Sequence, residues 1–192
     1  MLALPSAPAP EPRRQILVGT ALVVAAAASL VGGMTALFLR FRSVTIDNGE
    51  LWVPKDVKFS MVGANVMWIT LLPLCIFAQW AIYAAKRGDR AHTGVALGLS
   101  GLMALAFING QAFIYATTKM PVNLGTYSVM FYSLTGVVLL LAVVGLGFTV
   151  VTAFRYLGGR TSDREVVSAH ALYWYAFAAV FTVVWFVVYV TK

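Results

Sequence analysis

The sequence predicts an all-α fold, a polytopic membrane protein built as a bundle of five transmembrane helices. The first observation is composition: 60% of the 192 residues are hydrophobic and only 11% are charged, whereas a soluble domain carries about a quarter charged residues. The second is a set of five apolar stretches, each long enough to cross a bilayer core of about 30 Å, which takes roughly 20 helical residues. The third is that basic residues occur in short groups between these stretches, as in membrane-protein loops.

The formal net charge of +7 does not indicate a nucleic-acid partner. Nucleic-acid sites gather Lys and Arg on one face of an otherwise polar fold. Here the basic residues are divided among the segments that separate apolar stretches, so we expect no nucleic acid as a partner.

The first expected helix covers about residues 16–39 and follows a segment rich in Pro and Ala. That segment, residues 1–15 (MLALPSAPAPEPRRQ), is predicted to be a disordered cytoplasmic tail. The membrane domain is expected over residues 16–192. The first apolar stretch exceeds a secretory signal core of about 7–15 residues and no small-residue cleavage site follows it, which disfavours a signal peptide.

The other four helices are expected over about 61–85, 92–118, 127–156 and 168–190. The second contains Pro73, which membrane helices tolerate as a packing feature. The third carries Asn109 and Gln111 at mid-span, and Pro121 marks the turn before the fourth. The fifth begins at Ser168, after the charged segment that separates it from the fourth.

The distribution of basic residues predicts a cytoplasmic N-terminus and an external C-terminus. Eight Lys and Arg residues fall on the cytoplasmic side and six on the outside. Segment 86–90 (KRGDR) places three of them in five positions, whereas the first outer loop spreads four over about twenty residues beside Asp47, Glu50 and Asp56.

The spans contain no Asp, Glu, Lys or Arg between their ends. Such residues usually mark proton paths or ion sites, so their absence argues against a transporter. His92 and His170 are candidate haem ligands, but both are expected at cytoplasmic helix ends, where histidines are usually solvated. Cys75 cannot supply the paired thiolates of a metal cluster and is expected to be a small buried residue. We therefore predict no catalytic, cofactor-binding or metal-binding residue in this chain.

Small residues predict where helices approach one another closely. Gly94, Gly98 and Gly101 share one face of the third expected helix, and Gly136 and Gly145 lie in the fourth. These glycines are expected to contact either neighbouring helices of this chain or a partner, and contact within the chain is the favoured interpretation.

Residues 125–145 (GTYSVMFYSLTGVVLLLAVVG) resemble the signature of subunit III of the haem–copper oxidases, the cytochrome c oxidase family. The matching positions are Gly125, Phe131, Thr135, Gly136, Gly145 and Arg155, with Phe107, Gln111 and Tyr115 upstream, Tyr173 and Trp174 downstream, and Arg40 at the end of the first span. The resemblance covers residues 16–192. It implies the topology that the charges indicate, because short bacterial members have five helices with the N-terminus inside and the C-terminus outside. It also implies that Gln111, Tyr115, Thr135, Tyr173 and Trp174 are helix-packing or partner-contact residues.

The departures from the family pattern remove its buried ionisable groups. Val138, Leu141 and Tyr175 stand in place of histidines, Ile114 replaces a Glu, Ala178 replaces an Asp, and the run 25–29 lacks the membrane Glu of the first shared helix. We therefore do not expect the proton-handling contribution attributed to those carboxylates.

The resemblance implies a non-catalytic subunit III, or a subunit III-like accessory, of a respiratory terminal oxidase in the bacterial cytoplasmic (inner) membrane. Its expected partners are the catalytic subunit I, subunit II and membrane lipids, with a phospholipid held in a cleft between helices. Haem and copper are expected in the partner subunits. Two alternatives stay open: an accessory subunit of a nitric oxide reductase or another membrane oxidoreductase, and a free-standing small transporter or sensor.

Overall fold

The computed structural model describes residues 14–55, 57, 60–160 and 164–191. Its helices are α1 (Gln15–Asp47), α2 (Met61–Lys86), α3 (Arg90–Thr118), α4 (Thr126–Leu157) and α5 (Arg164–Trp185), and α5 continues as a π-helix over Phe186–Val190. A single 3₁₀ turn, Val122–Leu124, lies between α3 and α4. Five helices are long and apolar enough to cross a membrane, which confirms the predicted all-α membrane fold. The tail predicted over residues 1–15 lies, up to residue 13, outside the described residues.

The helix ends are fixed by local hydrogen bonds and by glycine. Ser60 Oγ accepts a hydrogen bond from the backbone N–H of Gly63 at the start of α2, and Asp89 Oδ1 accepts one from the N–H of His92 at the start of α3. Such N-caps satisfy N–H groups that have no partner within the helix. Between α2 and α3, Gly88 has φ +75°, a left-handed conformation that favours glycine.

Two helices extend beyond the apolar stretches that predicted them. α1 continues from Leu39 to Asp47, because the backbone hydrogen bonds of a helix persist outside the bilayer, where apolar residues are no longer required. α5 begins at Arg164, before the expected start at Ser168. This earlier start adds a helical turn at the beginning of α5 and changes the environment of the residues that follow.

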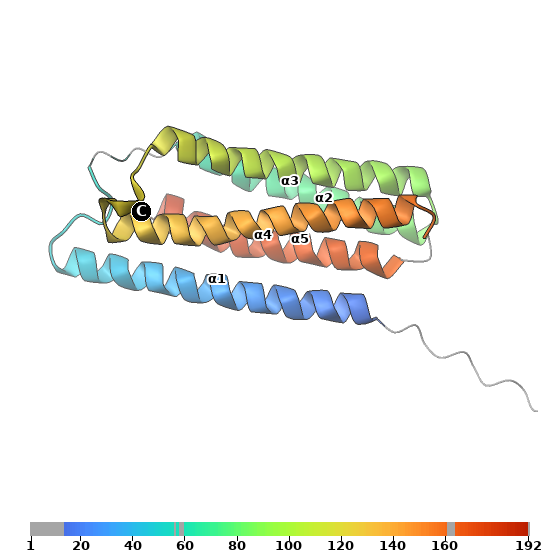
Figure 1. The fold of residues 1–192 in the computed structure, drawn as a ribbon, viewed down its shortest axis with the longest axis horizontal. Coiled ribbons are helices and arrows are strands. Elements are labelled where there is room, and N and C mark those ends of the chain that lie inside the picture. Colours follow the sequence, from blue (N-terminus) through green and yellow to red (C-terminus); the bar gives the residue numbers. More distant parts are fainter. Residues whose placement is uncertain (1–13, 56, 58–59, 161–163, 192) are drawn as a thin grey trace, which may run out of the picture.

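The helices lie side by side in an elongated bundle, with α1 at one edge (Figure 1). α2 packs against α3 and α5, and α4 also packs against α3 and α5, so these four helices form a closed group. α1 packs against α5 and to a smaller extent α4. The C-terminus lies at the opposite end of the bundle from the start of α1 (Figure 1), as five crossings require.

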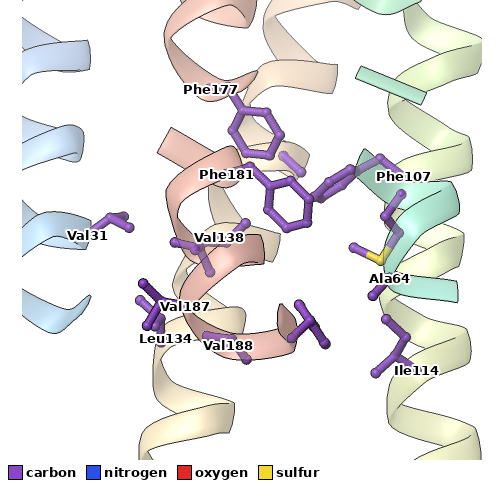
Figure 2. Close-up of a cluster of buried hydrophobic side chains, with 14 of the residues drawn as sticks. Val31, Ala64, Phe107, Ile114, Leu134, Val138, Phe177, Phe181, Val187 and Val188 are labelled. Atoms are coloured by element: carbon purple, nitrogen blue, oxygen red, sulfur yellow. The ribbon is translucent and has the colours of Figure 1, made fainter. Parts of the chain in front are cut away.

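The centre of the bundle is an aromatic cluster from α3 and α5. Figure 2 shows Phe107 meeting Phe177 and Phe181. The Phe107 ring centroid lies 5.2 Å from that of Phe177 and 4.7 Å from that of Phe181, both in edge-on contact. Edge-to-face contacts of this kind stabilise a pair beyond its area burial. On the α2 side, a Cβ added to Gly110 would lie 2.5 Å from Met67 Cγ, so α2 and α3 approach closely there.

Candidate functional site

Three of the predicted contact residues meet between α4 and α5. A Cβ added to Gly145 would lie 2.6 Å from Tyr173 Cε1 and 2.8 Å from Trp174 Cη2. The Tyr173 hydroxyl donates a hydrogen bond of 2.6 Å to the carbonyl oxygen of Leu141. The absence of a side chain at position 145 therefore leaves the space that the rings of Tyr173 and Trp174 fill. The hydrogen bond from Tyr173 to Leu141, one helical turn away, also joins α4 and α5.

A second group of predicted residues forms a polar cluster toward the C-terminal end of α3. The Tyr115 hydroxyl and Thr135 Oγ1 are 2.8 Å apart, and Thr135 also donates to the carbonyl of Phe131 at 2.6 Å. The Tyr189 hydroxyl donates over 3.5 Å to Oε1 of the fully buried Gln111. These contacts join α3, α4 and the π-helical end of α5. They are helix-to-helix contacts, and among the described residues they bring no acid–base set together.

The glycine face of α3 does not pack as a single surface. A Cβ on Gly94 would lie 2.9 Å from Leu157 Cδ2, the end of a flexible side chain, and one on Gly101 would make ordinary contact with Thr149 Cγ2 at 3.8 Å. No atom lies within 4 Å of a Cβ placed on Gly98 or on Gly136. The structure thus gives Gly94 and Gly101 neighbours within this chain, and Gly98 faces outward.

The two histidines occupy different environments. His92 is exposed, as expected at an interfacial helix start, and its Nδ1 lies 2.6 Å from Asp89 Oδ2. The hydrogen bond from the His92 backbone N–H lowers the pKa of the Asp89 carboxyl. The expectation of a solvated His170 is wrong, because this side chain is fully buried. The early start of α5 places His170 in the second helical turn, on the face that packs against α4.

His170 belongs to a buried hydrogen-bonded group with Thr149 and Trp174. Its Nε2 lies 2.9 Å from Thr149 Oγ1 and accepts from the Trp174 indole N–H at 3.1 Å, and the same indole is 3.0 Å from Thr149 Oγ1. An indole N–H can only donate, so Trp174 is the donor in both of its contacts, to Thr149 and to His170. The sequence analysis missed this contact; the four-residue spacing of His170 and Trp174, which places both on one helix face, is the sequence signal that could have indicated it.

The positions at which the resemblance implies ionisable side chains are filled differently here. Val138 and Ile114 are buried apolar residues. The hydroxyl of Tyr175 donates a 2.5 Å hydrogen bond to Gln79 Oε1. In residues 14–55, 57, 60–160 and 164–191, no group of three or more His, Cys, Asp or Glu side chains could hold a metal ion.

A pocket of about 550 Å³ opens between α1, α2 and α5 at the end of the bundle where α1 begins. Arg14, Lys86 and Arg164 lie on its rim and apolar side chains such as Ile82 line its depth. Glu165 Oε1, also in the lining, accepts a 2.9 Å hydrogen bond from the backbone N–H of Leu17. The pocket therefore combines a basic rim with an apolar interior, a suitable environment for an anionic amphiphile.

Comparison with known proteins identifies relatives over most of the chain. The family model described as cytochrome c oxidase subunit III matches residues 13–192. The probable cytochrome c oxidase subunit 3 of Mycobacterium tuberculosis is 26% identical over 188 residues, which cover 90% of this chain and 88% of the relative. The cytochrome c oxidase subunit 3 of Prototheca wickerhamii is 27% identical over 142 residues (73% of this chain and 54% of the relative), and that of Rattus norvegicus is 27% identical over 153 residues (77% and 56%). The chain thus spans about half the length of the algal and rat proteins.

Proposed function

This chain belongs to the cytochrome c oxidase subunit III family, and from that membership we propose that it is a non-catalytic subunit of a terminal oxidase complex. Its role is to pack against the catalytic subunit and stabilise it in the membrane. The observation that carries the proposal is the match of the family over residues 13–192. The relatives all bear the name of cytochrome c oxidase subunit 3, which favours neither a nitric oxide reductase accessory nor a transporter.

The internal arrangement of the chain supports a packing role. Gly145, Tyr173 and Trp174, matched to the family by sequence, meet in one contact between α4 and α5. Several polar side chains of the interior form helix-to-helix hydrogen bonds, as Tyr115 and Thr135 illustrate. The chemistry of the complex, with its haem and copper, belongs in this proposal to subunits I and II.

The proposed location is the bacterial inner membrane, with the N-terminus in the cytoplasm and the C-terminus outside. The three basic residues of segment 86–90 support that orientation, since short cytoplasmic loops are enriched in Lys and Arg. The pocket with Arg14, Lys86 and Arg164 on its rim supports a bound phospholipid, because basic side chains at the cytoplasmic surface attract anionic headgroups.

Purification in mild detergent tests the proposal. An affinity tag on this chain should bring down a complex with a haem absorption band, and mass spectrometry should identify the subunit that holds the haem. A parallel purification of a tagged, unrelated five-span protein from the same membranes is the control. Recovery of the chain free of any haem-bearing subunit, under conditions that keep the oxidase intact, would contradict the proposal.

A further inference from the structure

α1 and α5 are neighbouring helices that run in the same direction and are joined at both ends by a charged side chain. The backbone N–H of Leu17, in the first turn of α1, donates a 2.9 Å hydrogen bond to Oε1 of Glu165, in the first turn of α5. At the other end, Arg42 Nη2 donates a 2.8 Å hydrogen bond to the carbonyl oxygen of Thr191, directly after the π-helical end of α5. We call these contacts the Glu165 clamp and the Arg42 clamp.

Parallel neighbours place like partial charges side by side. A helix N-terminus has a partial positive charge and a C-terminus a partial negative charge. The starts of α1 and α5 therefore repel each other, and so do their ends. The Glu165 clamp places a carboxylate at the two starts, and the Arg42 clamp places a guanidinium at the end of α5 and near that of α1. Each clamp thus has the sign of charge that offsets the repulsion at its own end of the bundle.

The Glu165 clamp also satisfies a backbone group of α1. The first N–H groups of a helix have no acceptor within the helix, and that of Leu17 is one of them. Among the described residues, Arg14 occupies the N-cap position of α1, and its side chain makes no capping hydrogen bond. The acceptor for the Leu17 N–H comes instead from α5. The start of α1 is therefore capped by the same contact that attaches it to α5.

The packing of α1 is uneven along its length. Its buried residues are Val31, Thr35 and Phe38, all in the half toward Asp47. The Phe38 ring also meets the buried Trp52 ring edge-on, with centroids 5.2 Å apart. The half of α1 nearer its start instead borders the pocket of about 550 Å³ that it shares with α2 and α5. The second half of α1 is thus fixed by packing, whereas the first half is beside a hollow.

This difference matters because lipid gives helices no hydrophobic reason to associate. Helix contact in a membrane depends on close packing and on hydrogen bonds between helices. Since the first half of α1 has little packing, the Glu165 clamp provides a large share of its attachment. A hydrogen bond to an ionised group changes an equilibrium constant by about tenfold or more, so its loss is enough to alter the position of the half-helix.

We propose that α1 is a hinged helix: its second half stays fixed in the bundle, and its first half separates from α5 when the Glu165 clamp opens. Ile16 and Leu17 form one side of the pocket between α1, α2 and α5, so this separation opens the pocket toward the bilayer. The Glu165 clamp is therefore a latch that regulates entry of an amphiphile into the pocket. The hinge and the latch belong to this chain alone and do not depend on which complex contains it.

Distances between pairs of spin labels test the hinge in the full-length protein in lipid nanodiscs. In a Cys75→Ser background, Gln15→Cys with Ala91→Cys places labels at exposed positions at the end of the bundle where α1 begins, and Ser43→Cys with Ala116→Cys does so at the other end. Glu165→Ala should raise the ratio of long to short distances between residues 15 and 91 about tenfold in double electron–electron resonance. The distances between residues 43 and 116 should stay as in the parent, which also shows that the variant is folded.

Two variants serve as controls for the latch. Ser168→Ala alters the same pocket and the same helix, but Ser168 Oγ donates to the carbonyl of Arg164 within α5, so this variant should give parental distances. Glu165→Gln keeps an acceptor oxygen without the charge and should lie between the parent and Glu165→Ala. Parental distances between residues 15 and 91 in Glu165→Ala would overturn the latch, and equal changes at both ends would overturn the hinge.

The reactivity of a thiol in the pocket supplies an independent measurement. Ile82 lines the pocket from α2, so Ile82→Cys in the Cys75→Ser background should react with N-ethylmaleimide about tenfold faster when Glu165→Ala is added. Adding Ser168→Ala should leave the rate unchanged. A rate that does not respond to Glu165→Ala would show that α1 does not regulate access to the pocket.

Discussion

At the scale of single residues, Gly145 and Gly98 show that a glycine in a membrane helix can have opposite surroundings. The nearest atoms to a Cβ on Gly145 belong to two buried rings, whereas a Cβ on Gly98 meets nothing within 4 Å. Both positions were predicted as contacts on the same argument from spacing. Spacing identifies a face of a helix but not the neighbour that the face meets, and only the rotation of each helix in the bundle decides that.

The same substitution at these two glycines should therefore have opposite effects. Gly145→Ala should lower the free energy of unfolding by about 1–3 kcal/mol, as is usual for overpacked sites, because the added methyl group would lie within 3 Å of the rings of Tyr173 and Trp174. Gly98→Ala should leave stability unchanged or raise it by about 0.5–1 kcal/mol, the usual gain of Ala over Gly in a helix. Unfolding of the purified variants in mixed micelles of increasing SDS content measures both, and equal stability of the two would contradict the contact at Gly145.

The protonation of His170 can also be checked at the residue scale. With His92→Gln present as background, the one remaining histidine should show a protonated Nδ1 and a bare Nε2 in the ¹⁵N spectrum at pH 7.5. The reason is the indole N–H of Trp174, which donates to Nε2. Trp174→Phe removes this donor and should change the balance of the two tautomers, and a protonated Nε2 in the parent protein would rule out the hydrogen bond.

At the scale of elements, hydropathy was sufficient to predict five helices and their order. Hydropathy could not predict the helix ends. The length of an apolar stretch reflects the thickness of the bilayer, whereas the backbone hydrogen bonds of a helix can continue outside the bilayer. α1 therefore runs to Asp47 and α5 starts at Arg164. The early start of α5 also explains why the expectation for His170 was wrong. The additional turn at the start of α5 places His170 inside the bundle and not at a solvated helix end.

The start of α3 gives a prediction that depends on pH. The Asp89 carboxylate caps α3, and its pKa is lowered in the folded protein by that hydrogen bond. A lowered pKa means that the stabilisation is complete above the unfolded value of about 3.9 and is lost as pH falls through the folded value. Asp89→Ala should therefore lower the Tm in detergent at pH 5–8, and the difference from the wild type should shrink below about pH 4.

Asp89→Asn is the matched control for this cap. Asn is about as good an N-cap as Asp but does not titrate in this range, so this variant should keep most of the Tm at neutral pH. A Tm as low as that of Asp89→Ala would show that the negative charge stabilises α3, and that the hydrogen bond to the His92 N–H contributes little.

At the scale of the whole molecule, the odd number of crossings places the two ends of the chain on opposite sides of the membrane. In a Cys75→Ser background, Ser43→Cys and Ala91→Cys place single thiols at exposed positions at opposite ends of the bundle. A membrane-impermeant maleimide added to intact spheroplasts should label residue 43 and should reach residue 91 only after lysis. The reverse pattern would invert the proposed orientation.

The position of α1 at the edge of the bundle also affects how the protein is made. Its neighbours are α5 and α4, and the hydrogen bond from Leu17 to Glu165 spans 148 residues of sequence. At about 5–20 residues per second, the ribosome needs roughly 7–30 seconds to synthesise that much chain. During this interval α1 is already in the bilayer while α5, its main partner, is not yet made, so α1 must remain a helix without that contact. The uninterrupted apolar sequence of α1 allows it to stay inserted in lipid until α5 is made. Packing of α1 against α5 and α4 is then a late step of assembly.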